Sequence, residues 1–261
     1  MALKISANLG FLWTGMSLPQ AIEAAMRSGF DAVECHWPYG EDMSAVRAAL
    51  DEAGLPMLSV NTSKGDRPGD FGLAALPDRR EEARAAIEQA VEWASAIGAR
   101  NIHVMAGRIS RSRGSDAVFR DNLLYACELA GRHGIGVLIE PLNAFDSPGY
   151  FLDGFAPAGK IVEELGQPNL GVMLDCYHAA RMGLDPLEVF ASLGSIVSHI
   201  QIASSPDRSE PDHGDVDYDV LLSGLEAAGY SGFIGAEYRP RSSPEAGLAW
   251  LDRYRALSTE P

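Results

Sequence analysis

Eight short apolar segments recur along the chain, and a segment of helical character follows each of them. The apolar segments are rich in β-branched residues and too short for helices, so they are predicted to be β-strands. The intervening segments carry apolar residues three and four positions apart, which is the spacing of an amphipathic helix. Strands that alternate with helices pair in parallel, because each helix returns the chain to the same edge of the sheet. This alternation restricts the chain to an α/β fold.

The predicted strands cover residues 3–8, 32–35, 56–61, 101–106, 136–140, 170–175, 196–202 and 233–237. The predicted helices run from the N-cap candidate Ser17 to Gly29 and then over 42–53, 80–97, 116–133, 155–165, 186–193, 218–228 and 244–256. Eight such units in 261 residues have the size of a (β/α)8 TIM barrel. A doubly wound open sheet is the alternative, but the chain contains neither GxGxxG nor GxxxxGK[ST]. We therefore expect a single-domain TIM barrel over residues 1–261.

Composition excludes several classes of protein. No run approaches the ~18 apolar residues of a membrane-spanning helix, and no signal peptide is expected, because the N-terminus enters a strand pattern directly. The three cysteines share no motif spacing, which fits a reduced cytoplasm and argues against a thiolate metal site. The net charge of −15 argues against a nucleic-acid partner. The sequence does not determine the oligomeric state and is compatible with a homo-oligomer.

Polar oxygens stand at the ends of four consecutive predicted strands. An apolar run leads directly into Glu140, and Pro141 ends that strand because it has no N–H to donate. The next strand ends in Asp175, the seventh contains Gln201, and the eighth ends in Glu237. Because the carboxyl ends of barrel strands meet at one rim, these side chains are expected to converge.

Three converging carboxylates cannot all remain ionised without a positive counter-charge. A divalent cation supplies one, and an all-oxygen set suits Mg²⁺ or Mn²⁺ better than Zn²⁺. We therefore predict a metal site formed by Glu140, Asp175, Gln201 and Glu237. A single acidic residue after a strand is also a common helix N-cap or salt-bridge partner, so the prediction depends on the agreement of all four strand ends.

The long segment 62–77, rich in Gly, Pro and Asp, follows the third predicted strand. Loops of this length in a compact domain are usually functional or disordered. A lid over the strand ends is the preferred interpretation.

Several segments resemble the hydroxypyruvate isomerase family, which belongs to the xylose isomerase-like TIM barrels together with the tagatose and psicose epimerases. The resemblance covers essentially the whole chain. It is carried by LIEPLN at 138–143, DCYH at 175–178, HIQIA at 199–203 and GAEYRP at 235–240, and further by SANL at 6–9, AVE at 32–34, PY at 38–39 and RSEP at 208–211.

The resemblance implies that Glu140, Asp175, Gln201 and Glu237 bind the metal, and that Glu140 and Glu237 are also the acid/base pair. The related epimerases usually have His where this chain has Gln201, and Gln at this position resembles the hydroxypyruvate isomerase branch. The segment Cys35-His36-Trp37 departs from the more hydrophobic run of other members, which bears on the substrate more than on the type of reaction.

Three further residues are candidates for substrate binding. By the resemblance, His178 and Arg208 match positions that contact substrate oxygens in the epimerases. Arg208 and Arg108 are also candidates to bind a substrate carboxylate, because arginine binds carboxylates through two parallel hydrogen bonds. For Arg108 the alternative is a solvated loop charge, and for His178 it is a structural histidine. His103 is interpreted as a buried barrel histidine.

The expected function is a metal-dependent isomerase of a small hydroxy-carbonyl or sugar-acid substrate, with hydroxypyruvate to tartronate semialdehyde as the first choice. A 2-oxo-tetronate isomerase or a ketose 3-epimerase on the same site is the nearest alternative. An endonuclease-IV-like phosphodiesterase needs a histidine-rich zinc site, and the six histidines lie mostly away from the predicted strand ends. A barrel that binds a ligand without turnover is the remaining alternative.

Overall fold

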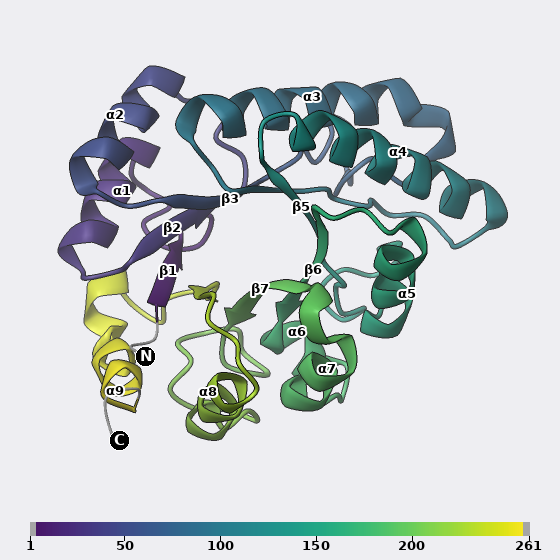
Figure 1. Cartoon of the computed structure of the whole chain (residues 1–261). Helices are drawn as coiled ribbons and strands as arrows, with labels where there is room; N and C mark the ends of the chain where they lie inside the picture. The colour runs from purple at the N-terminus through teal and green to yellow at the C-terminus, as the bar shows by residue number, and fades with distance from the viewer. Residues whose placement is uncertain (1–3, 258–261) are drawn as a thin grey trace.

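Eight parallel strands close into a barrel in the computed structural model, which describes residues 4–257 (Figure 1). The strands follow one another around the barrel in sequence order, and the last pairs with the first. They are β1 Lys4–Asn8, β2 Ala32–Cys35, β3 Met57–Asn61, β4 Asn101–His103, β5 Gly136–Ile139, β6 Leu170–Asp175, β7 Val197–Ile202 and β8 Phe233–Ala236. The predicted fold class is therefore confirmed.

The helices surround the barrel, as expected when each of them connects two parallel neighbours (Figure 1). They are α1 Leu18–Arg27, α2 Met43–Ala53, α3 Arg80–Ile97, α4 Arg113–Gly131, α5 Phe155–Leu165, α6 Cys176–Arg181, α7 Pro186–Leu193, α8 Tyr218–Ala227 and α9 Ala249–Leu257. Short 3-10 turns occupy Pro77–Arg79, Gly194–Ile196 and Pro244–Gly247.

Helix α3 illustrates how the apolar stripes predicted from the sequence hold the layers together. Its predicted apolar face is fully buried against the barrel and consists of Ala83, Ile87, Ala90, Val91 and Ala94. Burying one Ile or Val side chain contributes roughly 1.5–3 kcal/mol, so the stripe decides which face of the helix meets the sheet. Gly98 ends the helix in the left-handed conformation (φ 72°).

The observed boundaries differ from the predicted ones at several places. Helix α4 begins at Arg113 instead of residue 116, because the Ser112 hydroxyl accepts a hydrogen bond from the Ser115 N–H and caps the helix earlier. Strand β4 ends at His103 instead of residue 106, and the predicted last helix divides into a 3-10 turn and α9. Helix α6 was not predicted at all. Residue Leu3 of the first predicted strand lies outside the described residues.

The predicted lid segment is only partly free of the barrel. The N–H groups of Leu73 and Ala74 both donate to the carbonyl of Met105, and the Ala75 N–H donates to Ala106 (2.7 Å). Residues 73–75 are buried, so the second half of the segment is a fixed part of the barrel wall. Only the first half projects from it.

None of the helices within residues 4–257 has the length and apolar character to cross a bilayer. The thiols of Cys35, Cys127 and Cys176 are buried and form no disulfide. Burial raises the pKa of the Cys127 thiol to about 12, so this group is held in its protonated form.

The projecting half of the lid segment depends on one buried arginine. Arg79 is 7% exposed, and its guanidinium contacts Asp70 at 2.6 Å and Glu82 at 2.5 Å. We predict that Arg79→Ala lowers the free energy of unfolding by about 2 kcal/mol, because it leaves the partly buried Asp70 without its partner. Chemical denaturation measures the change. Arg67→Ala is the matched control, since Arg67 also pairs with Glu82 but is 62% exposed, and it should change stability little. Equal losses in both variants would contradict the prediction.

Candidate functional site

A cavity of about 70 Å³ opens at the carboxyl ends of the strands. Ligand sites of TIM barrels lie at this end, because the loops that follow the strands surround it. Its lining includes four of the predicted site residues, and consists of Phe11, His36, Trp37, Asn61, Phe71, His103, Met105, Glu140, Leu142, Ser147, His178, Arg208 and Glu237.

Glu140 follows β5 directly and is 6% exposed. Its Oε1 is buried and has no hydrogen-bond partner among the described residues, and its Oε2 lies 3.7 Å from Nδ1 of His103. Burial raises the pKa of Glu140 well above its ordinary value, and the charges of Glu237 and Asp175 raise it further. The carboxyl group is therefore stable as an anion only if a positive charge comes close to it.

Asp175 uses its two carboxylate oxygens for different purposes. Oδ1 accepts a hydrogen bond from the Tyr177 N–H (2.8 Å) and so caps the short helix α6. Oδ2 points the other way, towards Nη2 of Arg208 (3.3 Å) and Nε2 of His178 (3.6 Å). Burial raises the pKa of Asp175 to about 7 although Arg208 opposes the shift. An N-cap and a site carboxylate are thus combined in one residue.

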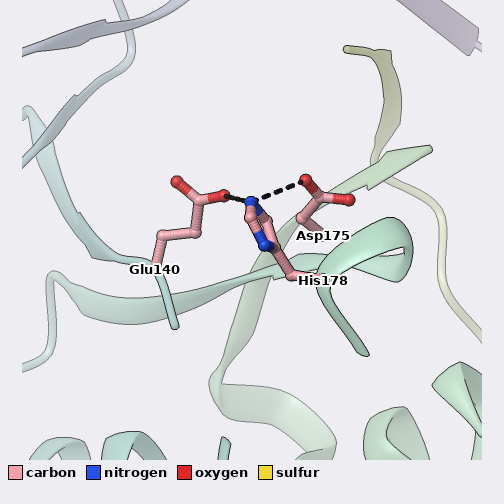
Figure 2. A group of neighbouring side chains, drawn as sticks. All are labelled: Glu140, Asp175 and His178. Atoms are coloured by element: carbon pink, nitrogen blue, oxygen red, sulfur yellow. Dashed lines mark ion pairs between the residues drawn. The ribbon is translucent and has the colours of Figure 1, made fainter. Parts of the chain in front are cut away.

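Helix α6 places the imidazole of His178 between the carboxylates of Glu140 and Asp175 (Figure 2). The Asn143 backbone N–H donates to Nδ1 of His178 (3.0 Å). The Asn143 side-chain amide lies 2.7 Å from the same nitrogen, and its oxygen accepts from the backbone of Phe145, which fixes the amide so that it donates to the ring. Because Nδ1 accepts, a neutral imidazole must carry its proton on Nε2.

The protonation state of His178 agrees with this arrangement. Burial, assisted by Arg208, lowers the pKa of His178 to about 3, so the ring is neutral near pH 7. Its Nε2–H then faces the space between Glu140 and Asp175, at 3.7 Å and 3.6 Å from their oxygens. A nitrogen that carries a proton cannot ligate a metal ion, so His178 is suited to donate a hydrogen bond to a ligand oxygen in this space.

Glu237 follows β8 and accepts hydrogen bonds from three directions. Its Oε1 lies 2.9 Å from Nδ2 of Asn8 and 3.1 Å from Nε2 of His36, and its Oε2 lies 2.5 Å from Nη2 of Arg208. Burial works to raise the pKa of Glu237, but Arg208 and His36 together hold it below its ordinary value. The carboxyl group of Glu237 is therefore ionised, whereas that of Glu140 is harder to ionise.

Arg208 supplies the positive charge nearest to these carboxylates. Its guanidinium lies between the rings of Phe11 and Tyr177, 4.9 Å from each centroid, and Nη2 bridges Asp175 and Glu237. Its backbone adopts φ 54°, which costs a non-glycine residue on the order of 1 kcal/mol. Its Nε is buried and has no hydrogen-bond partner among the described residues. The guanidinium as a whole lines the cavity.

Gln201 points into the barrel from β7. Its Nε2 donates to Oε2 of Glu34 (2.8 Å), whereas its Oε1 is buried without a hydrogen-bond partner among the described residues. This oxygen and Oε1 of Glu140 are the two fully buried side-chain oxygens of the predicted metal set without a hydrogen-bond partner. Unpaired buried acceptors are costly, and a cation is a partner suited to each of them.

The residues at this end of the barrel fit a divalent metal ion. A carboxylate oxygen of Glu140, one of Asp175 and a ring nitrogen of His178 lie within 4.8 Å of one another, and of these three groups the two carboxylates are the candidate ligands. Three ionised carboxylates and the single guanidinium of Arg208 would leave a local charge of −2, which one divalent ion neutralises. The fold and this acidic cluster thus favour metal binding, whereas the assignment of individual ligands stays a prediction.

Arg108 does not reach the cavity. Its guanidinium donates to the carbonyl of Gly69 (3.0 Å) and lies over the ring of Phe71, 5.1 Å from the centroid. Phe71 lines the cavity, so Arg108 supports the wall of the site from outside. The structure brings Glu140, Glu237, His178 and Arg208 to the cavity, with Asp175 and Gln201 next to them.

Three residues at the site were not singled out from the sequence as functional. Asn8, His36 and His103 stand at the ends of β1, β2 and β4, so the rule that located the four predicted ligands would also have found them. The expectation that the histidines lie mostly away from the strand ends was wrong for three of the six, since His36, His103 and His178 all line the cavity. Burial lowers the pKa of His103 to about 4, so this ring is also neutral.

Comparison with known proteins gives consistent results. Residues 22–254 match the family model of the xylose isomerase-like TIM barrel. The chain is 39% identical to the putative hydroxypyruvate isomerase of Homo sapiens, over 97% of this chain and 95% of that one. It is 40% identical to the 2-oxo-tetronate isomerase of Cupriavidus necator (96% and 98% covered) and 35% identical to the hydroxypyruvate isomerase of Escherichia coli (97% and 100%).

Solved structures agree with these relatives. A protein from Brucella melitensis titled AP endonuclease, family 2, superposes with a TM-score of 0.92 at 36% identity, covering 98% of this chain and all of that one. The D-allulose 3-epimerase from Methylomonas with bound D-allulose superposes with a TM-score of 0.77 at 18% identity (98% and 90% covered), which supports the fold alone. Barrel closure, the acidic cluster and full-length similarity to named isomerases lead to one conclusion: the chain is an isomerase that belongs to the hydroxypyruvate isomerase family of xylose isomerase-like TIM barrels.

Proposed function

We propose that this protein is a metal-dependent isomerase that interconverts hydroxypyruvate and 2-hydroxy-3-oxopropanoate. The observation that carries the proposal is the pair of buried glutamates, Glu140 and Glu237, that line one cavity at the ends of β5 and β8. Two carboxylates on one small cavity can take a proton from one substrate atom and deliver a proton to another. The named relatives at 35–40% identity support the substrate class.

A divalent cation would be held by Glu140, Asp175, Gln201 and Glu237. These residues offer only oxygen donors, so Mg²⁺ or Mn²⁺ is favoured over Zn²⁺. When bound, the ion would act as a Lewis acid that stabilises the enediolate of the substrate.

The reaction moves one carbon-bound proton and one hydroxyl proton, with no net change in atoms. Glu237, which Arg208 and His36 keep ionised, is the group that removes a proton from C3 of hydroxypyruvate. Glu140, which is ionised when the cation is bound, accepts the proton of O3 and delivers it to C2. Glu237 returns its proton to O2, so that C3 becomes the aldehyde, C2 becomes the secondary alcohol and both glutamates end ionised.

His178 is placed to polarise the substrate carbonyl. Its Nε2–H faces the space between Glu140 and Asp175. The proton of the neutral ring stays on Nε2, because Nδ1 accepts a hydrogen bond from Asn143. A fixed donor aimed at an oxygen that gains negative charge stabilises the transition state more than the ground state.

The cavity favours a short acidic substrate. Its volume of about 70 Å³ is far below the roughly 300–1,000 Å³ of pockets for drug-sized ligands. Arg208, which lines the cavity, is the residue we assign to the substrate carboxylate. A 2-oxo-tetronate, with one more carbon, is the second candidate, because the relative with that name is 40% identical to this chain over 96% of its length.

Phosphodiesterase chemistry on DNA is the rival from a different class, since one similar structure carries an endonuclease title. The net charge of −15 opposes contact with a phosphate backbone, and the small cavity favours a free three- or four-carbon acid. We therefore propose that nucleic acid is not a partner.

The decisive experiment is a substrate panel with the purified protein, before and after removal of metal by EDTA. Hydroxypyruvate, both 2-oxo-tetronates, free ketoses and an oligonucleotide with an abasic site are compared. We expect isomerisation of a short 2-oxo acid that is lost with EDTA and returns with Mn²⁺ or Mg²⁺. Cleavage of the oligonucleotide, or metal binding without turnover of any compound, would reverse the proposal.

Removal of either proton carrier should stop the reaction. We predict that Glu140→Gln and Glu237→Gln each lower kcat by roughly 10²–10⁴-fold, because each keeps the shape of the side chain but cannot carry the proton. Initial rates report the loss, and circular dichroism with the melting temperature verifies the fold. Glu163→Gln on exposed helix α5 is the control and should retain normal activity. Near-normal activity of either cavity variant would remove it from the acid/base assignment.

The role of Arg208 can be separated from the metal site by substrate choice. We predict that Arg208→Ala raises KM for acidic substrates by roughly 10–100-fold and for neutral ketoses by much less, because only the former lose a charged hydrogen bond. Because Arg208 also bridges Asp175 and Glu237, Mn²⁺ affinity is measured in parallel and the assays are run at saturating metal. Equal effects on both substrate classes would exclude Arg208 from carboxylate recognition.

A further inference from the structure

A further buried carboxyl group, that of Glu34, lies inside the barrel next to the predicted metal ligand Gln201. Glu34 is the third residue of β2 and is 1% exposed. Its Oε2 accepts from Nε2 of Gln201 (2.8 Å) and lies 3.1 Å from Nε2 of His199, and its Oε1 accepts from the Ser6 hydroxyl (2.9 Å). These residues come from β1, β2 and β7. Since β2 and β7 are not neighbours, their side chains can meet only inside the barrel.

The barrel leaves space for this cluster at Gly235 of β8. A Cβ atom at Gly235 would lie 2.2 Å from Oε1 of Glu34, 2.9 Å from Cγ of Gln201 and 2.9 Å from Nε2 of His199. All three contacts are too short for a real side chain, so the glycine is required by the cluster itself. The group around Glu34 is therefore built into the strand sequences and is not a chance contact.

This cluster determines how the side-chain amide of Gln201 is oriented. A carboxamide can turn either its oxygen or its NH₂ group towards a ligand, and only the oxygen can bind a cation. Because Nε2 donates to Glu34, the oxygen must face the other way, and this buried Oε1 has no hydrogen-bond partner among the described residues. Replacing Glu34 by a residue without a hydrogen-bond acceptor would allow the side-chain amide of Gln201 to rotate.

We propose that Glu34 is a positioning residue, which holds the carboxamide of Gln201 with its oxygen towards the cation. The inference rests on the metal site proposed above. Glu34 does not line the cavity, so it acts on the cation only through Gln201. Groups that orient a metal ligand from behind typically change metal affinity by about 10–100-fold when they are removed.

The test compares two substitutions of Glu34 that both remove its charge. Glu34→Leu has no acceptor for the amide of Gln201, whereas Glu34→Gln keeps a side-chain oxygen that can accept from Nε2 of Gln201. Both variants and the parent chain are titrated calorimetrically with Mn²⁺, and circular dichroism verifies that they fold.

We expect Glu34→Leu to bind Mn²⁺ about 10–100-fold more weakly than the parent, and Glu34→Gln to bind more tightly than Glu34→Leu. Loss of the Glu34 charge alone would weaken both variants equally. Ser6→Ala is the matched control, since it removes one donor to Glu34 and leaves the bond to Gln201, and it should change affinity by less than about threefold. Unchanged affinity in Glu34→Leu, or equal affinity in the two Glu34 variants, would overturn the proposal.

A readout without metal separates this inference from the proposed function. In the side-chain amide region of a ¹H–¹⁵N spectrum, the NH₂ group of Gln201 should exchange slowly with solvent in the parent and faster in Glu34→Leu. If the parent binds no Mn²⁺, the metal site fails whatever the spectrum shows. If the parent binds Mn²⁺ but the exchange rates and affinities of the two proteins are the same, only the positioning role of Glu34 fails.

Discussion

The structure depends on how negative charge is accommodated at one end of the barrel. Glu140, Asp175 and Glu237 are almost completely buried, and Arg208 is the cation that contacts two of them. Arg208 is held in place by two aromatic rings and by backbone bonds, since its own N–H donates to Ser204 (2.8 Å) and its carbonyl accepts from Arg239 (2.8 Å). Burial and mutual repulsion raise the pKa of Glu140 because this single guanidinium is not enough. A divalent cation would complete the balance, and in the proposed reaction the same carboxylates carry the protons.

The sequence predicted the parallel barrel and the four polar strand ends of its second half, because both follow from local patterns. The alternation of strand and helix patterns predicts the inner sheet and the outer layer of helices. A carboxylate directly after an apolar run can be recognised from the local sequence alone. Asn8 and His36 at the ends of β1 and β2 were not assigned roles, although both contact Glu237. Their importance arises from closure of the barrel, which brings β1 beside β8, and closure is a property of the whole chain.

Other features could not be predicted because they depend on single hydrogen bonds. The role of His178 follows from the backbone N–H of Asn143, which decides where the imidazole proton resides, and no residue pattern encodes that bond. Arg108 follows its strand closely enough to reach the site, yet it turns outwards to Gly69 and Phe71. Helix α6 is six residues long, too short for a periodic pattern, and exists because Asp175 caps it.

The cluster around Glu34 bears on the proposed metal site, since it offers an explanation of how a neutral amide would act as a ligand next to three carboxylates. An amide contributes an oxygen without adding charge, but it binds a cation in only one of its two orientations. The hydrogen bond from Gln201 to Glu34 selects that orientation, and Gly235 provides the space. An imidazole at the same position, which the resemblance implies for the epimerases, would donate its second N–H to the same carboxylate. The carboxylate of Glu34 can therefore accept a hydrogen bond from an amide or from an imidazole at this position.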